Sequence, residues 1–309
     1  MPSALPVIDL TPLAGGDARL NAVAAEIGAA CRDVGFFYVV NHGVPRALME
    51  EAFAQSRRLF ALPFAEKQAI AIETVGGNRG YIGLRREALD PARGPDMKEA
   101  FNVGLDLLPD DPEVIAGKPF RAPNAWPDLA GFRETTLAYF DACAALGRRI
   151  HRAFAHDLGL PPGFFEDKFG RPMATLRFLR YPAAPDANDA IGAGAHTDYG
   201  NLTLLATDDV GGLEVRRRSG EWIAAPPLAG AYVVNIGDCL MRWTNDIYVS
   251  NPHRVVNRGA RERYSIAFFF DPDPDALVAA IPSCVRDGVA KYPPILAADY
   301  LKQRLDATY

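Results

Sequence analysis

The sequence predicts a mixed α and β protein in which helices flank a C-terminal β-sandwich or barrel. In the N-terminal half, apolar residues recur at the spacing of amphipathic helices, most continuously over residues 127–160. After Pro172 the pattern changes to short runs of β-branched and aromatic residues, separated by Gly, Pro, Asn or Asp. Many short strands at close spacing are typical of a sandwich or barrel.

The first third of the chain mixes helical and extended patterns. Apolar periodicity over residues 17–34 predicts a helix that ends at Gly35, because glycine readily adopts the left-handed conformation that closes a helix. The aromatic and β-branched run Phe36–Val40 predicts the strand that follows. Further helices are expected over Arg46–Phe60 and Pro63–Ile70.

The remainder of the chain supplies the other expected elements. Glycine and proline are frequent between Thr74 and Pro95, which predicts a long loop. Residues 127–160 predict the longest helix, which would support the rest of the fold. The later runs that predict strands are Thr175–Tyr181, Leu202–Thr207, Leu213–Val215, Trp222–Ala225, Ala231–Ile236, His253–Val256 and Arg263–Phe270.

Composition points to a protein that binds a small molecule. The chain has 309 residues, with 33 basic and 38 acidic side chains and a net charge of −5. A chain of this length buries roughly three quarters of its unfolded surface, so its core needs no disulfide or structural metal. Nucleic acids and anionic membranes select for basic surfaces, so neither is expected as a partner.

Targeting and cysteine patterns favour a cytoplasmic location. The four cysteines form no C-x-x-C pair and are expected to be buried thiols. No apolar run reaches the roughly 18 residues of a membrane span, and the N-terminus lacks the pattern of a signal peptide.

The candidate chemistry centres on two of the five histidines. His196 and Asp198 are two positions apart, so in an extended backbone their side chains point to the same side. His253 begins a later strand, which could return antiparallel and add a third ligand. Two imidazoles and one carboxylate are the ligand set of non-haem Fe(II) oxygenases, although zinc accepts the same set.

A second pair of residues favours iron over zinc. Arg263 and Ser265 are again two positions apart on one predicted strand, so the guanidinium and the hydroxyl share a face. Arginine binds a carboxylate through two parallel hydrogen bonds, and a neighbouring hydroxyl can donate a third. This pair predicts a receptor for a small dicarboxylate beside the metal, which a hydrolytic zinc site does not need.

These elements resemble a known family. In order and spacing, His196-x-Asp198, His253 and Arg263-x-Ser265 are similar to the Fe(II)- and 2-oxoglutarate-dependent oxygenases of the isopenicillin N synthase-like family. The resemblance extends to segments outside the site, so it covers most of the chain. These segments are Pro6–Leu10, Gly35–Gly43 and Val234–Asp238.

The resemblance implies a distorted double-stranded β-helix, or jelly roll, flanked by helices that include a long scaffold helix. Residues 1–125 would form an N-terminal region of helices and strands on the core, and residues 126–170 the scaffold helix and its connection. Residues 171–275 would be the Fe(II)/2-oxoglutarate dioxygenase core, and residues 276–309 a C-terminal segment of the same compact unit.

The resemblance also implies a reaction. Fe(II) would be held by His196, Asp198 and His253, while 2-oxoglutarate would chelate the metal and place its far carboxylate on Arg263 and Ser265. With O2, the enzyme would oxidise, most simply hydroxylate, a C–H bond of a small molecule and release succinate and CO2.

Further residues of the pocket follow from the resemblance and from strand alternation. Tyr181 matches a tyrosine that helps to hold the co-substrate in many members, whereas Leu179 departs from the asparagine of plant members. Because Tyr181 and Arg177 have the same parity on their strand, Arg177 would also face the metal and bind substrate, with pairing to a surface acid as the alternative.

Aromatic side chains are candidate walls for the substrate. Phe269 has the parity of Arg263 on the same strand, and Tyr199 follows the metal ligand Asp198. Phe101 is a further candidate, with core packing as the alternative.

Other functions are compatible with the same residues. An oxidase of the same fold could use Arg263 and Ser265 to hold the carboxylate of its own substrate, and a non-catalytic relative could only bind a small molecule. A zinc hydrolase is the remaining alternative.

Arginine and aromatic walls suit a planar or carboxylated substrate, and candidates include pyrimidine-like heterocycles, amino-acid derivatives and other natural products. The oligomeric state is not indicated.

Overall fold

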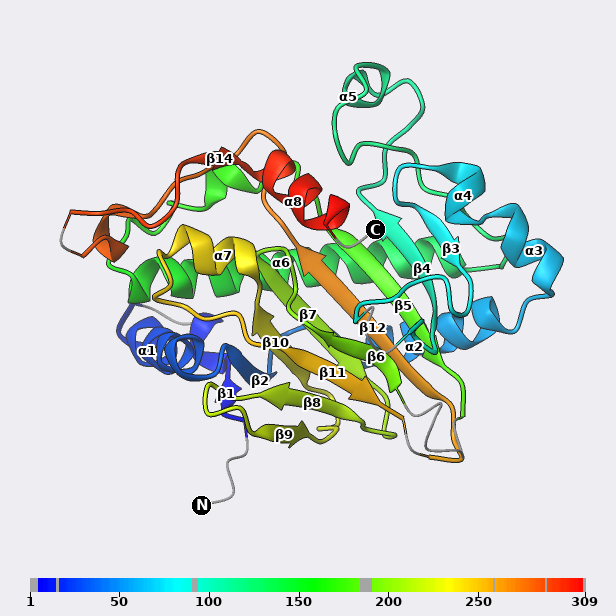
Figure 1. The fold of residues 1–309 in the computed structure, drawn as a ribbon, viewed down its shortest axis with the longest axis horizontal. Helices are drawn as coiled ribbons and strands as arrows, with labels where there is room; N and C mark the ends of the chain where they lie inside the picture. Colours follow the sequence, from blue (N-terminus) through cyan, green and yellow to red (C-terminus); the bar gives the residue numbers. More distant parts are fainter. Residues whose placement is uncertain are drawn as a thin grey trace.

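The structure, a computed structural model, describes residues 5–14, 17–90, 94–183, 191–257, 259–286 and 288–307, with backbone alone at 14 and 17–19. Two β-sheets face each other with helices packed outside them, so the expected distorted jelly roll is confirmed (Figure 1). No described helix combines the length and apolar character that crossing a membrane requires.

The major sheet combines four strands from residues 7–104 with four strands from residues 175–270. Its order is β1 (Val7–Asp9), β2 (Phe36–Val40), β10 (Tyr232–Ile236), β7 (Leu202–Thr207), β12 (Arg263–Phe270), β5 (Thr175–Tyr181), β4 (Glu99–Gly104) and β3 (Gly80–Ile82). The N-terminal region therefore adds strands to both edges of the sheet and does not form a separate layer.

The minor sheet covers the open face of the major sheet. Its order is β6 (Ile191–His196), β11 (His253–Val256), β8 (Leu213–Arg216) and β9 (Trp222–Ala225). A separate pair is formed by β13 (Leu277–Val278) and β14 (Ile295–Leu296).

The helices and short 3₁₀ turns lie outside the two sheets. They are η1 (Thr11–Ala14), α1 (Asp17–Asp33), α2 (Arg46–Phe60), α3 (Phe64–Ala69), α4 (Ile72–Val75), α5 (Pro112–Ile115), α6 (Phe132–Asp157), η3 (Glu166–Lys168), α7 (Asp238–Trp243), η5 (Pro282–Cys284) and α8 (Ala297–Asp306).

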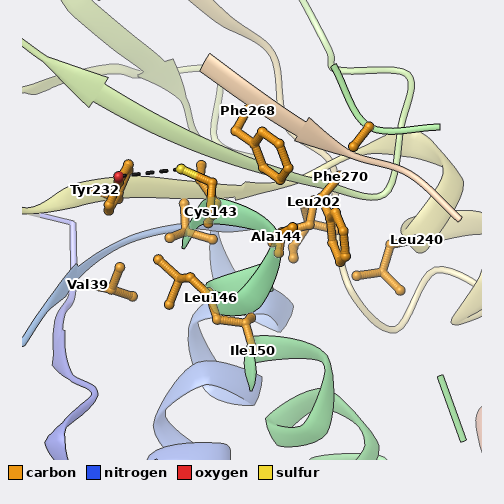
Figure 2. Packing of buried hydrophobic residues seen from close by; sticks show 14 of the residues in the cluster. Val39, Cys143, Ala144, Leu146, Ile150, Leu202, Tyr232, Leu240, Phe268 and Phe270 are labelled. Atoms are coloured by element: carbon orange, nitrogen blue, oxygen red, sulfur yellow. Dashed lines mark hydrogen bonds between the residues drawn. The ribbon is translucent and has the colours of Figure 1, made fainter. Parts of the chain in front are cut away.

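The long helix α6 supports the major sheet from the face opposite the minor sheet (Figure 1). Its buried stripe includes Cys143, Leu146 and Ile150. This stripe packs near Phe268 and Phe270, which lie on the face of β12 that is turned toward α6 (Figure 2). Gly147 permits this close approach, since a Cβ at that position would lie 2.6 Å from the Phe270 ring. Truncation of one such phenylalanine to alanine would cost about 3–5 kcal/mol.

The predicted strands after Pro172 are confirmed, with small shifts at their ends. Other features of the fold differ from the sequence-based expectation, and the strand β4 was not predicted. The long helix begins at Phe132, after Gly131 in a left-handed conformation, and ends at Asp157. The loop expected from Thr74 contains the edge strand β3. The strand β6 was not predicted, because its glycine- and alanine-rich sequence has low intrinsic β-propensity and forms a strand only by pairing with β11.

Candidate active site

Two strands of the minor sheet bring the two candidate histidines together. His196 ends β6 and His253 begins β11, and the two residues are direct partners in this antiparallel pair. Their ring centroids are 4.3 Å apart. Asp198 follows β6 in the turn that leads to β7, so the third group comes from the connection between the two sheets.

The three side chains converge on one point. Asp198 Oδ1 lies 3.8 Å from His196 Nε2 and 3.6 Å from His253 Nε2. Within the described parts of the chain, these three residues are the one group of this kind whose donor atoms all lie within 4.8 Å of one another. One nitrogen from each imidazole and one carboxylate oxygen form a facial ligand set that suits Fe(II) and leaves other positions for co-substrate and O2.

Neighbouring groups fix the orientation of these side chains. Asp198 Oδ2 accepts hydrogen bonds from Thr203 Oγ1 at 2.6 Å and Asn235 Nδ2 at 2.7 Å, so that Oδ1 faces the imidazoles. His196 Nδ1 donates to the Gly194 carbonyl at 2.7 Å, which leaves Nε2 deprotonated and available as a ligand. The Phe36 ring packs edge-on against the His253 ring at 5.2 Å.

Electrostatics favours the ligand forms of these groups. Burial lowers the pKa of His196, and the adjacent His253 lowers it further, so the imidazole is neutral at pH 7. Burial acts to raise the pKa of Asp198, but the two imidazoles and the hydrogen bonds from Asn235 and Thr203 outweigh it and lower this pKa. A neutral imidazole and an ionised carboxylate are the states that bind a metal.

A buried cation lies in the same cavity as the three ligands. Arg263 is fully buried, its Nε donates to the Gly211 carbonyl at 2.6 Å, and its Nη1 donates to Ser265 Oγ at 3.1 Å. Its Nη2 is buried and has no hydrogen-bond partner in the described part of the chain. The guanidinium carbon lies 4.8 Å from the centre of the Tyr181 ring, on the neighbouring strand β5.

The cavity beside the triad has a volume of about 200 Å³. Among its lining residues are Tyr181, Arg177, Tyr199 and Phe269, as expected from strand alternation and from position next to a ligand. Arg177 forms an ion pair with the buried Glu87, so the acid partner considered for it is present inside the cavity and not on the surface.

The expectation for Phe101 is corrected by the structure. Phe101 is fully buried, stacks edge-on against Phe132 of α6 at 5.7 Å and is not among the residues that line the cavity. Its neighbour Asn102 lines the cavity instead, because successive side chains of β4 point to opposite faces.

Several residues that support the site were not predicted from the sequence. Thr203 and Asn235, which hold Asp198, give no signal beyond their position in predicted strands. His151 is buried in the core, where its Nδ1 bonds to the Gly147 carbonyl and its Nε2 bonds to Asn201, in the turn after Asp198. Such contacts depend on which strands and helices pair, so local patterns do not predict them.

The fold and the metal-binding geometry together define a 2-oxoglutarate-dependent oxygenase. Residues 172–272 match the 2OG-Fe(II) oxygenase superfamily, and residues 5–129 match the family described as non-haem dioxygenase in morphine synthesis N-terminal. The chain is 39% identical to the 2-oxoglutarate-Fe(II) type oxidoreductase hxnY of Emericella nidulans, a match that covers 100% of this chain and 91% of the relative. It is 38% identical to homoarginine-6-hydroxylase 2-ODD-233 of Oryza sativa, with 98% and 96% covered.

Solved structures agree with this assignment. A full-length Neurospora crassa protein, crystallised in complex with α-KG and thymine, matches with a TM-score of 0.88 at 35% identity, covering 99% of this chain and 97% of that one. JOX2 in complex with 2OG, Fe and JA gives a TM-score of 0.81 at 31% identity, with 98% and 85% covered. The chain therefore belongs to the 2OG-Fe(II) oxygenase superfamily. It is a dioxygenase that uses Fe(II) and 2-oxoglutarate, with the HxD…H triad present.

Proposed function

We propose that His196, Asp198 and His253 bind the iron and that Arg263 and Ser265 bind the far carboxylate of 2-oxoglutarate. The observation that carries this proposal is the buried Nη2 of Arg263, without a partner among the described residues, in the cavity that contains the triad. A buried cation without a counter-charge is costly, and a carboxylate at this point would satisfy both its charge and its free donors. Tyr181 packs on the guanidinium and restricts its movement.

With these assignments, each residue has a simple task in the reaction. The bound metal and co-substrate supply the chemistry, in which 2-oxoglutarate is decarboxylated to succinate as O2 is reduced and a substrate C–H bond is oxidised. The triad would occupy three coordination positions of the metal. The hydrogen bonds from Thr203 and Asn235 maintain the orientation of the Asp198 carboxylate. Arg263 and Ser265 orient the co-substrate, while the apolar walls exclude bulk water from the reacting atoms.

We further propose a small, planar or carboxylated substrate, held among Arg177, Tyr199 and Phe269. All three line the cavity, whose volume of about 200 Å³ suits a small molecule. Relatives bind small molecules that are consistent with this range, since the Neurospora crassa protein was solved with thymine and JOX2 with JA. Two aromatic walls favour a flat group between them.

The co-substrate assignment is tested by Arg263→Ala, with Arg261→Ala as the matched control. Arg261 lies two residues before Arg263 and pairs with the exposed Asp209. We expect Arg263→Ala to raise the 2-oxoglutarate KM by about 100-fold or more, because charge-assisted bonds to a buried carboxylate are lost. Fe(II) affinity should change little, and Arg261→Ala should keep the wild-type KM.

The measurement is anaerobic titration of Fe(II), and then of 2-oxoglutarate, followed by the visible absorption band of the chelate and by succinate formation in air. An unchanged 2-oxoglutarate dependence in Arg263→Ala would overturn the assignment. Loss of iron binding to the same extent as loss of co-substrate binding would show that the substitution had damaged the whole site.

A further inference from the structure

The cavity is elongated along two paired strands. Thr175, Arg177, Leu179 and Tyr181 of β5 all line it, and Tyr181 is the direct partner of Arg263 in β12. The six residue steps from Tyr181 to Thr175 correspond to roughly 20 Å of extended strand. The proposed 2-oxoglutarate clamp therefore lies toward one end of the cavity, and the region around Thr175 forms the other end.

Arg79 lies at this far end. It precedes β3 and lines the cavity, and its guanidinium rests on Gly104 of β4, the direct partner of Thr175. A Cβ at Gly104 would lie 2.0 Å from Arg79 Nη2, so the absence of a side chain at this position makes room for the guanidinium.

The Arg79 side chain is buried with most of its hydrogen-bonding capacity unused. It is 2% exposed, and its two hydrogen bonds go to the backbone carbonyls of Asn78 at 3.2 Å and Phe120 at 3.3 Å. Its Nε is buried without a partner, and within the described chain Arg79 forms no ion pair. A guanidinium has five N–H donors and remains charged at neutral pH, so a positive charge is held here without a counter-charge.

The other cations on the substrate side of the cavity are compensated. Arg177 pairs with Glu87, and Lys98 lies 3.3 Å from the same carboxylate and also pairs with Asp96. Arg263 is at the opposite end and is assigned to the co-substrate. Asp271 also lines the cavity, but its Oδ1 accepts a hydrogen bond from the Asn201 N–H and it forms no ion pair with Arg79. Among the residues that the structure describes, Arg79 is therefore the cation on the substrate side that has no ion-pair partner.

From this arrangement we propose that Arg79 binds a carboxylate of the primary substrate and that the enzyme acts on small monocarboxylates. This inference rests on the proposed function, because it assigns Arg263 to 2-oxoglutarate and leaves Arg79 for the substrate. The substrate carboxylate lies at the far end of the cavity, and the C–H bond to be oxidised lies toward the triad. Specificity then comes from a charge at one end of the molecule and the Phe269 and Tyr199 walls along it.

Burial accounts for the strength expected of this contact. Burial and the nearby Arg121 lower the pKa of Arg79 to about 10, so the side chain is destabilised in its charged form but is still protonated at pH 7. An arriving carboxylate removes this penalty and accepts hydrogen bonds from a fixed, planar donor group. A neutral carboxamide of the same shape cannot supply the charge.

The test compares acids with their amides on the holoenzyme. Benzoate, phenylacetate and indole-3-acetate, each paired with its carboxamide, are titrated anaerobically by calorimetry into protein loaded with Fe(II) and 2-oxoglutarate. In the wild type, at least one acid should bind about tenfold or more tightly than its amide. In Arg79→Met, affinity for that acid should fall about 10- to 100-fold, whereas affinity for the amide should change less than about threefold.

Two further variants separate recognition from folding. Arg79→Lys keeps the charge without the planar donor group and should retain part of the preference for the acid. Arg86→Met removes an exposed arginine from the following segment, where it pairs with Glu73, and should bind like the wild type. The melting temperature of each variant is recorded with its affinities.

Three results would count against the proposal in different ways. Equal binding of acids and amides by the wild type would overturn it. It would also be overturned if Arg79→Met lost affinity for the acid and the amide equally and had a lowered melting temperature, because this result would indicate a structural role for Arg79. A wild-type protein that forms no chelate with Fe(II) and 2-oxoglutarate would instead refute the co-substrate assignment on which the proposal rests.

Discussion

At the scale of single residues, Asp198 divides its two carboxylate oxygens between different tasks. Oδ1 faces the two imidazoles, while Oδ2 is held by Thr203 and Asn235. With Asp198 as the proposed metal ligand, the buried amide of Asn235 would act on the metal through Asp198 and is a positioning residue. This arrangement makes the geometry of the triad depend on β7 and β10, which carry no metal ligand themselves.

A substitution at Asn235 tests this dependence. Asn235→Leu keeps the approximate shape but removes the donor to Asp198, and we expect Fe(II) affinity to fall about 10- to 100-fold. Val233→Ala is the control. Val233 is buried on the same strand and the same face as Asn235, but its side chain gives no hydrogen bond to Asp198. Affinities are measured by anaerobic Fe(II) titration. Equal losses in the two variants would indicate that packing, not the hydrogen bond, supports the metal.

At the scale of elements, the C-terminal helix α8 (Ala297–Asp306) contributes side chains to the wall of the cavity. Its Leu301 and Leu305 line the cavity, and its Arg304 pairs with Asp238 at 2.8 Å. Asp238 also accepts a hydrogen bond from Thr197, which lies between two of the triad residues. One carboxylate thus connects helix α8 to the turn that carries Asp198.

Removal of this connection should loosen the helix. In Arg304→Ala, we expect amide exchange over residues 297–306 to increase by about fivefold or less, since a partly exposed ion pair contributes about 1 kcal/mol or less. Succinate formation uncoupled from substrate oxidation should increase, because water would reach the site more easily. Lys302→Ala is the matched control, since Lys302 pairs with Asp306 on the same helix. Identical exchange in the two variants would contradict the role of Asp238.

At the scale of the whole molecule, α6, the major sheet and the turn that carries Asp198 form one connected unit. His151 of α6 is buried in the core, and its two ring nitrogens bond to Gly147 and Asn201. Because the Gly147 carbonyl can only accept, Nδ1 carries the proton and Nε2 accepts from the Asn201 amide. Burial, aided by Arg148, lowers the pKa of His151 to about 4 despite the hydrogen bond to Gly147.

This lowered pKa predicts a dependence of stability on pH. Between about pH 6.5 and 4 the unfolded chain binds a proton at residue 151 that the folded chain does not bind. The contribution of His151 to the free energy of unfolding is therefore fully present above pH 6.5 and is lost as the pH falls toward 4. The full loss is roughly 3 kcal/mol. His151→Gln should flatten this part of the curve, measured by urea unfolding at several pH values. His156→Gln, which removes an exposed histidine of the same helix, should keep the wild-type slope, and a wild-type slope in His151→Gln would contradict the prediction.

How far the site could be predicted depends on the range of the interactions involved. Spacing by two on a strand is sufficient for Arg263 with Ser265 and for Tyr181 with Arg177, because alternation is a local property of extended backbone. The strand β6 escapes prediction because its residues have little preference for strands and need β11 as a partner. The prediction for Phe101 is wrong because the local sequence does not reveal its strand, β4, or the face of that strand on which it lies.

The sequence by itself determined the class of chemistry: the ligand types, their order and spacing, and an arginine and serine on one strand face. These depend on chemical identity and local periodicity, which a sequence displays directly. Only the tertiary structure decided which charges are compensated. Within the described residues, Arg177 has its acid and Arg79 does not, because long-range pairing of β3, β4 and β5 determines which groups are buried together.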